Sequence, residues 1–157
     1  MEEKIRIGIK YGNMAFLAIF AGFLALNLFL YFIFEELILP EFSEEMFEEN
    51  LSTALLFLLR ILVINPISEE GVFRLIPINI ASRIWGRENK IVWTVIIISS
   101  IIFGLIHGSW RNIFLQGSAG IVFSIAFLKG GYISSAVAHS YCNLLIAMLS
   151  IMKILFF

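Results

Sequence analysis

The hydropathy pattern divides the chain into long apolar runs separated by short charged segments. Residues 11–34 contain no charged side chain, and a helix of that length crosses about 30 Å of hydrocarbon. Further apolar runs follow at residues 51–67, 91–106, 112–128 and 133–157. The pattern predicts an all-α, polytopic transmembrane helix bundle with about five spans. We treat residues 1–157 as a single membrane domain, with an N-terminal span at 11–34 and a core at 51–157.

Two prolines interrupt the second apolar run and the segment after it. Pro66 and Pro77 each lack a backbone N–H, so each is expected to kink or break its helix. Broken backbone at membrane depth is tolerated only where protein or a wet cavity surrounds it. The sequence therefore predicts broken or kinked helices around a buried polar site. Gly108 is expected to end the helix that precedes it.

Composition narrows the class of protein. Apolar residues make up 60% of the chain and the mean hydropathy is +0.94, which is outside the range of soluble domains. The net charge of −1 and the absence of a basic tract give no indication of nucleic acid. The expected surroundings are membrane lipid. The single cysteine, Cys142, excludes an intrachain disulfide.

The charged segments between the apolar runs predict the orientation. Residues 35–50 contain seven glutamates and are expected to form a loop in water. Basic residues occur at 4–10, at 83–90 and at Lys129, all on one side of a five-span arrangement. The positive-inside rule assigns that side to the cytoplasm. We therefore expect an integral protein of the cytoplasmic membrane with a cytoplasmic N-terminus.

An unusual charge cluster lies inside the apolar core. Glu69, Glu70 and Arg74 stand in a segment that is otherwise suited to lipid, where charges are costly unless they are paired or used. On a helix, Glu70 and Arg74 are at i,i+4 and share one face, while Glu69 points about 100° away. This spacing predicts that Glu70 is braced and that Glu69 is free for chemistry.

The two histidines of the chain, His107 and His139, both fall within or at the end of apolar runs. A single membrane histidine is commonly a packing residue, but two of them together with Glu69 indicate a site. His139 and Asn143 are at i,i+4, so one helix face presents two donors to a developing oxyanion. Glu69 is then the general base, with His107 sharing the water that it activates. The inferred reaction is hydrolysis of an acyl bond, most simply a peptide bond.

Three ordered motifs carry a family resemblance. Glu69-Glu70-x-x-x-Arg74, Phe103-x-x-x-His107 and His139-x-x-x-Asn143 resemble the motifs of the CPBP family, the intramembrane proteases that include CAAX prenyl endopeptidases, bacteriocin-processing proteins and Abi proteins. The resemblance covers residues 69–143.

The resemblance implies an all-helical membrane protease with defined roles for these residues. Glu69 and His107 would prepare the attacking water, and His139 and Asn143 would stabilise the oxyanion. Glu70 and Arg74 would orient the site, and Phe103 would give it shape. The expected partner is a peptide or a lipidated protein; a prenylated C-terminal tail, a peptide leader and a membrane-protein stub all fit.

Metal use is a separate question. Members of the resembled family have been described as metalloproteases, and Glu69, His107 and His139 are the candidate ligands for a divalent metal such as zinc. The chain has no His-Glu-x-x-His zinc signature. We therefore predict catalysis without a cofactor, by glutamate-activated water.

Other readings of the same residues remain open at this stage. Ser118 lies within Gly117–Gly120 and precedes His139, so a rhomboid-like Ser118/His139 dyad is one alternative, although such small residues commonly form helix contacts. A pair of Cys142 with His139 is another. A proton-relay transporter would also use buried Glu, His and Arg. The last alternative is a non-catalytic immunity or scaffold protein.

Overall fold

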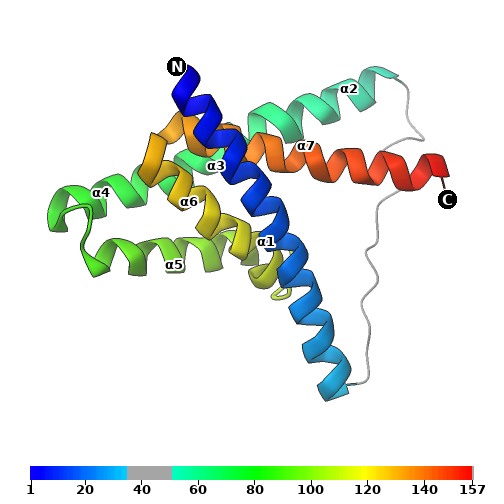
Figure 1. The fold of residues 1–157 in the computed structure, drawn as a ribbon, viewed down its shortest axis with the longest axis horizontal. Coiled ribbons are helices and arrows are strands. Elements are labelled where there is room, and N and C mark those ends of the chain that lie inside the picture. The colour runs from blue at the N-terminus through cyan, green and yellow to red at the C-terminus, as the bar shows by residue number, and fades with distance from the viewer. Residues whose placement is uncertain (35–50, 157) are drawn as a thin grey trace.

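The computed structural model describes residues 1–34 and 51–156 of the chain, and this part forms helices and no strand (Figure 1). The elements in chain order are α1 (Glu2–Phe34), α2 (Leu51–Leu59), η2 (Arg60–Ile64), α3 (Asn65–Glu70), η3 (Gly71–Leu75), α4 (Ile76–Trp85), α5 (Lys90–Leu105), η4 (Ile113–Gly117), α6 (Ser118–Gly130) and α7 (Tyr132–Phe156). The elements η2, η3 and η4 are single π-helical turns. The acidic segment predicted as a loop lies outside the described residues.

The helices confirm the predicted all-α transmembrane bundle. Four described stretches are long and apolar enough to cross a membrane: Glu2–Phe32, Ser52–Trp85, Ile113–Gly130 and Tyr132–Met152. The shorter apolar helix Lys90–Leu105 lies between the second and third of these. The first helix begins at Glu2, nine residues before the apolar run predicted from the sequence, because charged residues continue a helix without belonging to its apolar part.

Of the two outcomes expected at each proline, a kink or a break, the break does not occur. Ser52–Trp85 is one helical stretch, and a π-helical turn precedes each proline instead. The N–H of Asn65 donates to the carbonyl of Arg60, and the N–H of Ile76 donates to that of Gly71. This i→i+5 pairing widens the helix, which relieves the clash of a proline ring with the preceding turn. The helix continues because it widens at these two positions.

Each proline still leaves a backbone carbonyl without its helical donor, and another helix supplies one. The α-helical donor for the carbonyl of Phe73 would be residue 77, a proline, and Ser99 Oγ from α5 donates to that carbonyl at 2.6 Å. The carbonyl of Ile61 would pair with residue 66 in a π-turn, and Asn143 Nδ2 from α7 donates to it at 2.8 Å. Such rescue from neighbouring helices is what makes proline tolerable in a membrane span.

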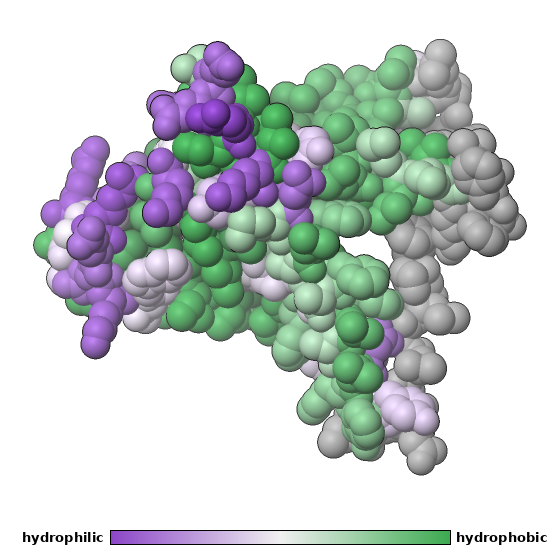
Figure 2. Space-filling model, viewed as in Figure 1, coloured by the Kyte–Doolittle hydropathy of each residue, from purple (hydrophilic) through white to green (hydrophobic). Residues whose placement is uncertain are grey.

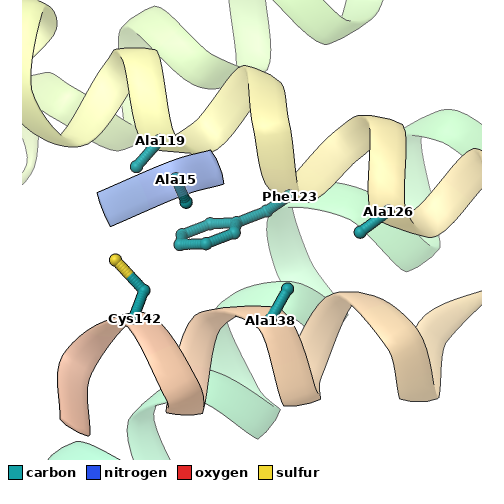
Figure 3. Packing of buried hydrophobic residues seen from close by; sticks show 6 residues of the cluster. All are labelled: Ala15, Ala119, Phe123, Ala126, Ala138 and Cys142. Atoms are coloured by element: carbon teal, nitrogen blue, oxygen red, sulfur yellow. The ribbon is translucent and has the colours of Figure 1, made fainter. Parts of the chain in front are cut away.

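Small residues allow α1 to lie closely across α6 and α7 (Figures 1 and 3). One buried cluster joins the three helices and comprises Ala15, Ala119, Phe123, Ala126, Ala138 and Cys142. Lipid tails are as apolar as these side chains, so association in a membrane depends on close contact. Phe123 is the one large member, and alanines from all three helices surround it. The packing therefore fixes the position of Phe123 between α6 and α7.

The described ends of the helices agree with the predicted grouping of basic residues. Ser134 Oγ, at the start of α7, donates to the carbonyl of Lys4 in α1. Phe127, near the end of α6, packs with Ile78 of α4 and Val92 of α5. The hydrophilic side chains in Figure 2 gather over the N-terminal end of α1 and the α4–α5 turn. The basic ends of α1, α4, α5 and α6 and the start of α7 therefore lie on one side of the bundle, and the side of the membrane they face stays a prediction.

We predict that Gly22→Ala destabilises the protein. A Cβ at Gly22 in α1 would meet the carbonyl oxygen of Phe114 in η4, and forced overpacking typically costs about 1–3 kcal/mol. The melting temperature of the purified protein in detergent should fall. Gly71→Ala is the control, because Gly71 has helical backbone angles and nothing within 4 Å of its missing Cβ. Equal melting temperatures for both variants would contradict the close α1–η4 contact.

Candidate active site

The four predicted catalytic residues line one cavity. Glu69, His107, His139 and Asn143 all face a space of about 270 Å³. They come from α3, the turn after α5, and α7. The remaining lining residues are Phe57, Ile61, Asn65, Gln116, Ile146, Ala147 and Ser150. The sequence did not single out Gln116, which η4 places on the cavity wall.

The predicted brace between Glu70 and Arg74 is present. Arg74 Nη1 lies 3.1 Å from Glu70 Oε1, and both side chains are fully buried. The guanidinium also lies over the ring of Phe103, at 4.4 Å from Cζ to the ring centroid. Gly120 makes room for it, since a Cβ there would be 2.6 Å from Arg74 Nη2. This cation is therefore held by one carboxylate and by aromatic faces.

Glu70 also binds α7 through both of its oxygens. His139 Nδ1 is 3.0 Å from Glu70 Oε1, and Ser135 Oγ donates to Glu70 Oε2. A carboxylate only accepts hydrogen bonds, so Nδ1 of His139 carries the proton of that bond. This arrangement leaves Nε2 as the nitrogen that can face the cavity. Glu70 is thus a structural centre of the site.

Glu69 has the opposite environment. Its side chain is 22% exposed, and its Oε2 lies 3.8 Å from His139 Nε2. That oxygen is buried and has no hydrogen-bond partner among the described residues. Adjacent glutamates on one helix therefore differ as the sequence predicted: both oxygens of Glu70 are engaged, whereas Glu69 lines the cavity and has an oxygen without a hydrogen-bond partner.

His107 stands just beyond the end of α5. Its Nδ1 is 2.7 Å from the carbonyl oxygen of Phe103. A carbonyl only accepts hydrogen bonds, so Nδ1 carries the hydrogen and Nε2 is left as an acceptor. Gly108 follows with φ +96°, a conformation that favours glycine, so the predicted helix stop is confirmed. Asn112 Nδ2 donates to the carbonyl of His107 at 2.6 Å. The turn is thereby fixed on both sides of the imidazole.

Asn143 uses one of its two amide N–H groups outside the cavity. That group donates to the carbonyl of Ile61, the acceptor left by the π-turn before Pro66. An amide carries two donors, so one N–H of Asn143 remains for a ligand. Asn143 therefore joins α7 to the helix that carries Glu69, a contact that sequence spacing did not indicate.

Aromatic rings hold the two imidazoles. Phe103 is fully buried and contacts His107 and His139 edge to face, at centroid distances of 4.7 and 5.7 Å. Phe123 stacks on His139 at 4.6 Å with an interplanar angle of 16°. Phe103 was predicted from the sequence to shape the site, whereas Phe123 was not predicted, because its only signal is its place in an apolar run. Ser135 was also missed, although it lies one turn before His139 on the same helix face.

Comparison with known proteins identifies the family of the chain. A protein-family model described as Rce1-like, type II CAAX prenyl endopeptidase, matches residues 51–145. That range is more than half of the chain and contains all four cavity residues named above. The chain belongs to the Rce1-like family of CAAX prenyl endopeptidases. No curated protein and no solved structure matches it.

The resemblance of the three motifs to the CPBP family is thereby confirmed, because that family includes the CAAX prenyl endopeptidases. The match begins with α2 and ends within α7, so α1 lies outside it. Membership identifies this Rce1-like chain as an intramembrane endopeptidase in general terms.

Neither Ser118 nor Cys142 forms the pair with His139 that the serine and cysteine protease alternatives require. Ser118 Oγ donates to the carbonyls of Leu115, at 2.7 Å, and Ala18, at 3.3 Å, and it lines a separate apolar cavity against α1. The proposed rhomboid-like Ser118/His139 dyad is therefore wrong for this Rce1-like protein, since His139 contacts glutamates instead. Cys142 is fully buried in the apolar cluster of Figure 3, where a thiol packs as a small hydrophobe.

The candidate metal ligands share the cavity without forming a metal-binding group. Within residues 1–34 and 51–156, no three or more His, Cys, Asp or Glu side chains are placed to hold a metal ion together. Glu69, His107 and His139 are therefore not placed to hold a metal ion together in this arrangement, and catalysis without a metal stays a prediction.

We predict that Glu70→Ala destabilises the protein far more than Glu69→Ala does. Removing Glu70 leaves Arg74 buried without a counter-charge, which typically costs about 3–5 kcal/mol. Glu69 is partly exposed and makes one long contact, so its loss should have little effect. Thermal unfolding in detergent measures both. Similar melting temperatures for the two variants would contradict the different environments of these glutamates.

Proposed function

We propose that this protein hydrolyses a peptide bond of a membrane-associated, CAAX-type substrate, with Glu69 as the general base. The observation that carries the proposal is the contrast between the two glutamates. The partly exposed side chain of Glu69 lines a cavity that His107, His139 and Asn143 also line, and its Oε2 has no hydrogen-bond partner among the described residues, while Glu70 has both oxygens engaged. A base needs an unoccupied acceptor within reach of water.

The first step is the addition of water to the scissile carbonyl. Glu69 accepts a proton from the water as the water oxygen bonds to the carbonyl carbon. His107 supports this step, because its Nδ1–H is committed to Phe103 and its Nε2 can accept a hydrogen bond from the same water. The electron pair of the C=O bond moves to oxygen and forms an oxyanion.

The oxyanion then receives hydrogen bonds from α7. His139 Nε2 and the second N–H of Asn143 are donors on one helix face. His139 can donate from Nε2 when it carries a second proton, and in that form the carboxylates of Glu69 and Glu70 lie one on each side of the ring. The cluster of two carboxylates, one guanidinium and His139 is electrically neutral in this form. A neutral cluster is the arrangement that a membrane interior tolerates best.

Collapse of the tetrahedral intermediate completes the reaction. The C–N bond breaks, and Glu69 returns its proton to the leaving nitrogen. One water is consumed, and the products are a carboxylic acid and an amine. Glu69 is again a carboxylate, and Glu70 and Arg74 keep their charges throughout. They act as supports that hold His139 in place.

The cavity wall suits an apolar substrate. Beyond the polar residues, Phe57 and Ile61 of the second span face Ile146 and Ala147 of α7. The description of the family names a prenyl endopeptidase, and a prenylated C-terminal peptide would bring its scissile bond into the membrane through its lipid. We therefore propose a prenylated peptide or protein as the substrate, rather than a soluble peptide leader. The family also favours hydrolysis over the proton-relay and scaffold alternatives.

We predict that Glu69→Gln abolishes cleavage without unfolding the protein. Glutamine keeps the shape of the side chain and cannot take the proton, so the rate should fall by about 100-fold or more. The assay is cleavage of a farnesylated CAAX peptide by purified protein in detergent. The same peptide without the farnesyl group should be cleaved more slowly.

Glu88→Gln, in the exposed α4–α5 turn, is the matched control and should cleave at the wild-type rate. Each reaction is repeated with a chelator. Full activity of Glu69→Gln would end the proposal for Glu69, and loss of wild-type activity with chelator would replace glutamate-activated water with metal-dependent chemistry.

We also predict that Ser118→Ala and Cys142→Ala both keep substantial activity. Neither side chain lines the cavity that holds Glu69, and removal of a nucleophile from a serine or cysteine protease costs at least about 1000-fold. Initial rates with the farnesylated peptide, normalised to folded protein, provide the measurement. A 1000-fold loss in either variant would reinstate the corresponding nucleophile.

A further inference from the structure

Ser135 lies in a position that none of the three motifs includes. It is fully buried in α7, one turn before His139. Its hydroxyl donates to Glu70 Oε2, on the opposite side of that carboxylate from His139 and Arg74. This is the one described hydrogen bond to Oε2, because the other contacts of Glu70 use Oε1.

A carboxylate held at one oxygen can still rotate. The terminal torsion of glutamate is broad, so contacts to Oε1 alone leave the plane of the group poorly defined. The Ser135 hydroxyl holds the second oxygen and thereby fixes the plane. Oε1 then stays on His139 Nδ1. Serine and imidazole are four residues apart on one helix, so their spacing is fixed by the backbone.

The imidazole needs this constraint because its aromatic neighbours do not supply it. Phe123 stacks on the ring of His139, and Phe103 contacts it edge to face. These contacts define the ring plane but are almost unchanged when the ring rotates by 180°, which exchanges nitrogen and carbon positions. The hydrogen bond from Nδ1 to Glu70 distinguishes the two orientations. It keeps Nε2 toward Glu69 and the cavity.

We propose that Ser135 is a positioning residue for catalysis. Acting through Glu70, it selects the ring orientation of His139 that places Nε2 at the cavity. The inference rests on the proposed function for its effect on rate and on the structure alone for its effect on the imidazole. The two effects are measured separately.

The first experiment compares Ser135→Ala with Ser134→Ala in the full-length protein. The two serines are adjacent in α7 and both fully buried, but Ser134 Oγ donates to the carbonyl of Lys4, away from the site. Ser135→Ala should lower kcat about tenfold, the effect of losing one hydrogen bond to a charged group. The KM for the farnesylated peptide should change less than about twofold. Ser134→Ala should keep the wild-type kcat, and Ser135→Thr, which restores a hydroxyl, should recover activity.

The second experiment observes the imidazole of His139 directly by ¹⁵N NMR spectroscopy. The chain has two histidines, so labelling with ¹⁵N-histidine gives two rings, and His107→Gln assigns them. Ser135→Ala should shift the ring nitrogen signals of His139 and leave those of His107 unchanged. Ser134→Ala should shift neither. If Ser135→Ala fails to fold, Ser135→Cys, whose thiol is only a weak hydrogen-bond donor, keeps the site filled and should produce the same change.

The outcomes separate the two proposals. A shift of the His139 signals in a protein that cleaves no prenylated peptide would support the positioning role and reject the proposed function. Unchanged His139 signals and unchanged kcat in folded Ser135→Ala would overturn the positioning role and leave the proposed function intact. Equal losses of kcat in Ser134→Ala and Ser135→Ala would also overturn it, because packing would then explain both.

Discussion

A carboxylate with no solvent exposure inside a membrane protein requires full compensation, and Glu70 obtains it from two helices. Arg74 supplies the counter-charge from the next turn of the same helical stretch, while His139 and Ser135 supply hydrogen bonds from α7. Gly120 leaves space for the guanidinium, and Phe103 covers it. These contacts hold the second span against α7. Glu70 is thereby taken up by the helix contacts, and Glu69 beside it lines the cavity.

The same constraint separates the roles of two adjacent, chemically identical residues. Glu69 lies about 100° around the helix from Glu70 and meets the cavity instead of the cluster. Its Oε2 has one long contact with His139 and no hydrogen bond within the described part of the chain. The imidazole of His139 spans the two carboxylates, with one nitrogen toward each. One imidazole ring therefore lies between the buried carboxylate of Glu70 and the carboxylate of Glu69, which lines the cavity.

Much of this could be predicted from local spacing. Apolar runs predicted the all-α bundle, and i,i+4 spacing predicted the Glu70–Arg74 pair and the common face of His139 and Asn143. The missed features depend on contacts between distant helices. Neither Ser135 nor Phe123 carries a local signal for its partner, and Gln116 reaches the cavity only through the turn at η4.

The prolines show a different limit of sequence reasoning. Pro66 and Pro77 indicate that backbone N–H donors are missing, but they do not indicate whether the helix breaks or widens. The outcome also involves other helices, since Ser99 and Asn143 donate to the backbone carbonyls left without a helical donor. The long contact of Glu69 with His139 likewise follows from the tertiary position of α7 and was not predicted from the sequence. The proposed pairing of Glu69 with His107 around water stays a prediction.

The placement of both members of the Glu70–Arg74 pair on a single helical stretch bears on biosynthesis. A nascent span enters the bilayer before all of its later partners have been made, and an isolated charge at that moment would resist insertion. Here the charges of Glu70 and Arg74 neutralise each other within about one helical turn. The segment therefore contains a counter-ion for each of these two charges when it inserts into the membrane. The dependence on α7 begins only afterwards, when the helices assemble.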